Sequence, residues 1–221
     1  MSEMLAARQN MVDCQIRPSD VTDLRLIDTM LAVPREVFVP QDRRALSYLD
    51  QDIEVGAAGD RKAFLIKPAV LARMLQAATI APTDRVLVVG CASGYAAAVV
   101  AGLAKHVFAT ESNPDIAAAA RTALAQAGAG HVDVAVADAA AGRPDAAPFD
   151  VIVLDGATEV VPDKLYRQLR RGGRLVGVFA LSTPPRATLV TRSPTDYGNR
   201  TLFDATEPVL PGLERVPVFT F

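Results

Sequence analysis

The chain of 221 residues has few cysteines, almost no net charge and no long apolar run. Its two cysteines, Cys14 and Cys91, lie far apart and match no disulfide or zinc pattern. The formal net charge of -2 offers no broad basic surface, so we expect no nucleic acid partner. No apolar run reaches the roughly 20 residues of a membrane span, and no basic region followed by an apolar stretch marks a signal peptide. We therefore expect a cytoplasmic protein with free thiols and no membrane partner.

Hydrophobic residues make up 50% of the chain and charged residues 22%, which is typical of a folded globular protein. The length allows one sizeable domain, and we find no repeats. We predict a single domain over 1–221 with three segments: a helical segment over 1–68 that faces the substrate, a core over 69–180, and a β extension over 181–221. Helices are expected over 1–16 and 23–31, and the second begins after Thr22 as its N-cap.

The core segment alternates aliphatic runs with amphipathic helical stretches. We expect strands at 85–89, 106–110, 132–137, 149–154 and 174–179. We expect helices at 69–77, 95–103, 114–127 and 162–169. This alternation predicts an α/β fold with a doubly wound, mostly parallel sheet. The short runs ATLVT, RTLFD and VPVFTF after residue 181 predict antiparallel strands at the edge of this sheet. Residues 50–63 read as a strand and a loop whose two glycines mark a tight turn or a mobile lid.

The stretch VLVVGCASGYAA, residues 86–97, breaks a buried strand with a glycine turn. Gly90 follows the strand and Gly94 opens the next helix, so the backbone can turn sharply and approach a ligand closely. Glu111 ends the next strand about 20 residues later, where such folds place a carboxylate for ribose hydroxyls. Asp138 ends another strand. These positions predict a nucleotide-type ligand beyond the carboxyl ends of the strands.

NAD is the first candidate ligand, but the dinucleotide fingerprint G-x-G-x-x-G is not met because Ala92 stands at its second glycine. An NAD-dependent oxidoreductase therefore stays a distant alternative. Asp155 in VIVLDGAT either faces the cleft or belongs to an Asp-Gly turn, and we favour the turn. Cys91 is expected to pack rather than to act as a nucleophile, since no base is adjacent. Arg61 and Lys62 in the glycine loop are candidates for attracting an acidic substrate.

Nearly the whole chain resembles the protein-L-isoaspartate O-methyltransferase family. The resemblance rests on VTDLRLIDTMLAVPREVFVPQDRRALSYLDQDIEV, on VLVVGCASGYAAAVVAGLAKHVFATE and on PFDVIVLDGATEVVPDKLYRQLRRGGRLVGVF. It implies a class I, Rossmann-like methyltransferase fold, S-adenosylmethionine as cofactor, and methylation of isomerised aspartyl residues in a protein or peptide during protein repair. It also implies a set of cofactor-binding positions: Gly90, Cys91, Ser93, Gly94, Glu111, Asp138 and Ala139.

The sequence departs from the family pattern at several of its motifs. Ile66 occupies the position of the family's serine in Ser-x-Pro-x-x-x-Ala, so we assign no catalytic residue and no metal ligand. Val88 replaces an acid whose carboxylate would accept a hydrogen bond near the charged methionine part of the cofactor. Ala92 replaces a glycine. One lost charged hydrogen bond costs about 1.5–3 kcal/mol, so we expect weaker cofactor binding, by tenfold to several hundredfold. A family member that only binds a protein partner is the alternative.

Overall fold

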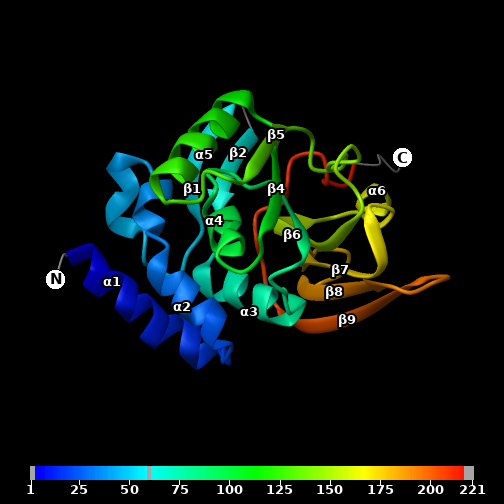
Figure 1. Ribbon diagram of the computed structural model, residues 1–221, viewed down its shortest axis with the longest axis horizontal. Helices are drawn as coiled ribbons and strands as arrows, with labels where there is room; N and C mark the ends of the chain where they lie inside the picture. Colours follow the sequence, from blue (N-terminus) through cyan, green and yellow to red (C-terminus); the bar gives the residue numbers. More distant parts are fainter. Residues whose placement is uncertain (1–2, 59–60, 217–221) are drawn as a thin grey trace, which may run out of the picture.

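The computed structural model describes residues 3–58 and 61–216, and a seven-stranded sheet forms its centre (Figure 1). The helices are α1 (Glu3–Met11), α2 (Leu24–Ala32), α3 (Pro68–Ala78), α4 (Tyr95–Ala101), α5 (Pro114–Gln126) and α6 (Asp163–Tyr166). The strands are β1 (Ile53–Ala58), β2 (Arg61–Leu65), β3 (Arg85–Val89), β4 (His106–Glu111), β5 (Asp133–Val136), β6 (Phe149–Thr158), β7 (Leu169–Phe179), β8 (Arg186–Arg192) and β9 (Tyr197–Asp204). Within this part of the chain, no helix has the length and apolarity to cross a membrane.

The large sheet has the strand order β5-β4-β3-β6-β7-β8-β9. The first five strands run parallel, whereas β8 and β9 continue the sheet in antiparallel fashion, as predicted. The chain builds β3, β4 and β5 in one direction and then crosses to the other side of β3 for β6. The order therefore reverses between β3 and β6, and a doubly wound sheet binds its ligand outside the carboxyl ends of the strands at this switch point.

Strand β3 shows why the core strands could be located from sequence. Val86 and Val88 belong to one hydrophobic cluster, which includes residues of α3, α4 and α5. Leu87 and Val89 belong to the cluster on the other face, which includes Leu165 of α6. Both faces are covered, so the strand is apolar at successive positions rather than alternating.

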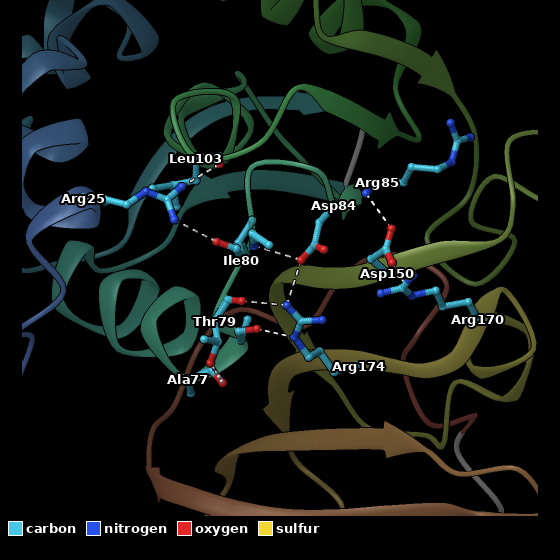
Figure 2. Close-up of polar contacts among 12 residues, drawn as sticks. Arg25, Ala77, Thr79, Ile80, Asp84, Arg85, Leu103, Asp150, Arg170 and Arg174 are labelled. Atoms are coloured by element: carbon cyan, nitrogen blue, oxygen red, sulfur yellow. Dashed lines mark hydrogen bonds and ion pairs between the residues drawn. The ribbon is translucent and has the colours of Figure 1, made fainter.

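Polar contacts fix the opposite, amino-terminal edge of the sheet (Figure 2). Arg174 Nη2 lies 2.8 Å from Asp84 Oδ2 and also donates to the carbonyl oxygen of Thr79. Asp150 Oδ2 accepts from the backbone amide of Arg85 at 2.8 Å. These contacts tie the starts of β3 and β6 to β7 and to the end of α3, so the switch point at the other end rests on a fixed frame.

Three local predictions were wrong in detail. Asp23, not Thr22, caps α2, since its carboxylate accepts from the amides of Arg25 and Leu26. The predicted helix over 162–169 is only α6, because Leu169 pairs with Phe149 and starts β7 early.

The third wrong prediction is the loop before residue 63. This stretch contains the start of a second strand, because β1 and β2 pair as an antiparallel hairpin. Residues 59–60 and 217–221 lie outside the described part of the chain, including most of the last predicted strand run.

Candidate active site

A cavity of about 340 Å³ lies at the carboxyl ends of β3, β4 and β6, at the switch point of the sheet. Small-molecule sites have volumes of about 300–1,000 Å³, so the cavity suits a ligand of this class. Its wall comes from β2, the turn after β3, the end of β4, the start of α5, the loop after β5, the later part of β6 and a C-terminal segment. The polar and charged residues of this wall are Lys62, Glu111, Ser112, Asn113, Asp115 and Asp155.

The C-terminal segment that forms part of this wall is Pro208–Pro211, and it passes beside β6 (Figure 1). Ala157 of β6 donates to the carbonyl oxygen of Pro208 at 2.8 Å and accepts from the amide of Leu210 at 2.9 Å. A Cβ atom on Gly90 would lie 2.4 Å from Leu210 Cδ2. Glycine after β3 accommodates both this close packing and the φ of +71°.

The turn after β3 keeps the shape of a glycine turn although Ala92 stands inside it. Ala92 has a φ of +47°, in the left-handed region that L-residues adopt at a cost. Its amide donates to Glu111 Oε2 at 3.1 Å, which helps to hold this conformation. Ala92 also lines the cavity.

Glu111 ends β4 and lies in the cavity wall, as the sequence predicted. It is buried, and the amide of Asn113 and the hydroxyl of Ser112 donate to its Oε1 at 3.0 and 3.3 Å. With Ala92 on Oε2, three donors fix the carboxylate in one orientation. A carboxylate has about four acceptor sites, so Glu111 keeps capacity for a ligand hydroxyl.

The structure brings Gly90, Glu111 and Ala139 together in the cavity wall, but not the other predicted cofactor residues. The Ser93 hydroxyl donates to the carbonyl oxygen of Phe38 at 2.6 Å and therefore serves packing. Asp138 is exposed.

Cys91 and Gly94 shape the turn rather than the wall. Cys91 donates its amide to the carbonyl oxygen of Thr110, and its own carbonyl accepts from Gly94. Burial, with the nearby charge of Glu111, raises the pKa of the Cys91 thiol. This favours the uncharged thiol and agrees with the packing role expected for it.

The prediction that Asp155 belongs to a turn was wrong. Asp155 lies inside β6, is buried and lines the cavity. Its Oδ2 is buried and has no hydrogen-bond partner in the described part of the chain. Burial raises the pKa of Asp155 to about 7; Arg35 opposes this shift and Glu111 adds to it. The signal that points to it in the sequence is the one that identified Glu111: an acid directly after an apolar strand.

Ile66, at the position of the family's serine, is buried, and its side chain is not in the cavity wall. Its carbonyl accepts from Nη2 of the buried Arg35 at 2.9 Å. Lys62 lies in the wall and pairs with Glu54 at 2.9 Å. Within residues 3–58 and 61–216, no cluster of three or more His, Cys, Asp or Glu residues could hold a metal ion.

Comparison with known proteins connects the sequence to one family. The sequence profile of the protein-L-isoaspartate(D-aspartate) O-methyltransferase family matches residues 6–189. The chain belongs to this family. It is 42% identical over 171 residues to a protein-L-isoaspartate O-methyltransferase of Methylorubrum populi, covering 77% of this chain and 78% of that one. A relative from Marinobacter nauticus is 41% identical over 169 residues, covering 76% and 75% of the two chains.

Solved structures of this family share the fold at low sequence identity. A protein-L-isoaspartate O-methyltransferase structure superposes with a TM-score of 0.83 at 22% identity, covering 94% of this chain and 67% of that one. A Plasmodium falciparum structure described in the same terms, in complex with S-adenosyl-L-homocysteine, has a TM-score of 0.77 at 15% identity. It covers 95% of this chain and 99% of that one. The class I methyltransferase fold predicted from the sequence is therefore confirmed.

Proposed function

We propose that this protein is an S-adenosylmethionine-dependent carboxyl methyltransferase that acts on isoaspartyl residues in proteins, and so serves protein repair. The observation that carries the proposal is Glu111, held by three donors in a cavity at the switch point of a chain of this family. Nothing in the described residues favours the alternative of a binding protein without activity.

The cavity wall fits the cofactor in its chemistry. Glu111 can accept from the ribose hydroxyls, and the apolar side chains of Ile116, Val209 and Leu210 offer a surface for the adenine ring. Two acids, Glu111 and Asp155, suit a ligand that carries a sulfonium and an ammonium group. When bound, the cofactor supplies an electrophilic methyl group.

The reaction needs little acid–base catalysis from the protein. A free α-carboxyl group has a pKa near 3.3–3.7, so the acceptor oxygen is already ionised at neutral pH and needs no general base. The residues of the cavity therefore have to align the acceptor with the methyl group and exclude water. Ile66 offers no hydroxyl for this purpose, and we propose that the ammonium group of Lys62 in the wall attracts the anionic acceptor.

Transfer of labelled methyl groups from S-adenosylmethionine to an isoaspartyl peptide tests the proposal, with the aspartyl peptide as a control. Glu111→Gln removes one charge and should weaken cofactor binding by about 10- to 150-fold in titration calorimetry. Glu3→Gln, at an exposed position of α1, should bind like the unmodified protein. Absence of transfer at saturating cofactor would refute the activity.

We further propose that the protein works in the cytoplasm and without nucleic acid. Cys14 and Cys91 are both free thiols, which suits a reducing compartment. The net charge of -2 offers no basic footprint for nucleic acid.

A further inference from the structure

Asp155 sits at the point of the sheet where the two halves of the fold diverge. Leu154 of β6 pairs with Val89 of β3, so Asp155 is the next residue on β6, just as Gly90 is the next residue on β3. Both residues line the cavity. The carboxyl group of Asp155 is thus carried by β6 at the switch point, directly after the last pair with β3 and within the stretch between Val153 and Ala157 where the register with β7 shifts.

One oxygen of this carboxyl group lacks a hydrogen-bond partner among residues 3–58 and 61–216. Oδ2 of Asp155 is buried and accepts no hydrogen bond. Arg35 is the cation that lowers the pKa of Asp155. Its guanidinium group, however, donates to the carbonyl oxygens of Ser47 and Ile66. Native proteins rarely leave a buried polar atom unpaired, and such an atom in a cavity wall indicates a missing donor or cation.

The same region lacks an acid that the family pattern would supply. Val88 stands where the first motif usually carries an acid near the charged methionine part of the cofactor, and Val88 is fully buried in β3. Since β6 is the direct neighbour of β3, an acid at the end of β6 reaches the same end of the sheet. The carboxylate lost from one strand is therefore present on the next.

We propose that Asp155 is the counter-charge of the positively charged methionine part of S-adenosylmethionine and replaces the acid missing at Val88. This inference rests on the proposed function, because it concerns the same cofactor. The ammonium and the sulfonium groups share the chemistry that a buried carboxylate recognises, and the test below separates them.

The charges around Asp155 give the proposal a pH dependence. Burial, which raises its pKa to about 7, and Glu111 from β4 both favour the protonated form, whereas Arg35 opposes it. Cys91 lies close in the turn after β3, and Lys62 of β2 and Asp115 of α5 face the same cavity.

A bound cation favours the ionised carboxylate over the protonated form. Cofactor binding should therefore release a proton near pH 7 and weaken as the pH falls from 7.5 to 6. The range stays below about pH 7.7, where α-amino groups begin to lose their charge.

The test is titration calorimetry of the full chain and its Asp155→Asn variant between pH 6 and 7.5. We expect Asp155→Asn to bind S-adenosylmethionine about 10- to 100-fold more weakly at pH 7.5, and without the pH dependence or the proton release. The matched control is Asp204→Asn, which removes an exposed carboxylate paired with Arg186 at 3.2 Å. Thermal unfolding at pH 7.5 should show Asp155→Asn more stable than the unmodified protein, since a buried unpaired carboxylate is removed.

Three ligands identify the group that Asp155 faces. S-adenosylhomocysteine keeps the ammonium but not the sulfonium, and 5′-methylthioadenosine has neither. Weaker binding of both S-adenosylmethionine and S-adenosylhomocysteine by Asp155→Asn would support the inference with the ammonium as the partner. Weaker binding of S-adenosylmethionine alone would support it with the sulfonium. Unchanged binding of 5′-methylthioadenosine shows in either case that the variant's site is intact.

Equal affinity of Asp155→Asn and the unmodified protein for S-adenosylmethionine at every pH would overturn the inference and leave the proposed function standing. Equal losses for all three ligands would also overturn it, because they would indicate a general disturbance of the site. If the unmodified protein bound none of the three, the proposed function itself would fall.

Discussion

Replacing Ala92 by glycine isolates the strain in the turn that follows β3. Ala92 is buried, lines the cavity and has a φ of +47°. Ala139 is also buried and also lines the cavity, but it is not among the described non-glycine residues with positive φ. The two alanines therefore differ mainly in backbone conformation. Ala139→Gly is the matched control for Ala92→Gly.

The expected magnitudes follow from three contributions. An L-residue in the left-handed region costs roughly 1–2 kcal/mol, which Ala92→Gly relieves. Each alanine-to-glycine change also costs about 0.4–1 kcal/mol through the unfolded chain and about 0.8 kcal/mol for the buried methyl group. Ala92→Gly should thus leave the free energy of unfolding nearly unchanged, whereas Ala139→Gly should lower it by about 1–2 kcal/mol.

The measurement is thermal unfolding of the three proteins in one buffer, without cofactor. A change of 1 kcal/mol shifts the Tm of a protein of this size by about 2–4 °C. The two variants should therefore differ by about 2–8 °C, with Ala92→Gly the more stable. Equal losses of Tm in the two variants would show that the turn stores no strain at Ala92 and would refute the reasoning.

Two further changes test the C-terminal segment and the residue that precedes it. Gly90→Ala should lower the Tm strongly, because its new Cβ would lie 2.4 Å from Leu210 Cδ2 at a φ of +71°; in the background of Leu210→Ala the same change should cost less, and equal costs would contradict the steric reason. Glu207 is buried beside Lys67, and burial, with Asp52 adding, raises its pKa to about 9. A raised pKa gives stability at low pH that is lost as the pH rises toward 9, so Glu207→Gln should gain Tm over the unmodified protein from pH 5 to 9, and a constant difference would contradict the assignment.

The core strands could be predicted because each strand begins and ends at turn residues next to it in the sequence. Strand β3 was placed at 85–89, where the structure has it, since an apolar run is bounded by a turn on each side. The hairpin of β1 and β2 and the early start of β7 were not predicted. Both depend on pairing with partners, such as that of Leu169 with Phe149, which no local pattern reveals.

The cavity was predicted in part for the same reason. Glu111 ends its strand where the apolar run ends, so its place was readable from the sequence. Asp155 is followed by a glycine, which locally favours a turn. The strand continues instead because Ala157 exchanges hydrogen bonds with Pro208 and Leu210, which are distant in the chain. No pattern in the sequence near the glycine turn indicates that Pro208–Pro211 forms part of the cavity wall.

The position of Pro208–Pro211 has a consequence for the coupling between ligand binding and chain closure. These residues follow β9 and contact Ala157 and Gly90, which lie far away in the sequence. A ligand that binds only the closed cavity stabilises the docked segment by mass action. The segment is therefore held most firmly when the cavity is filled.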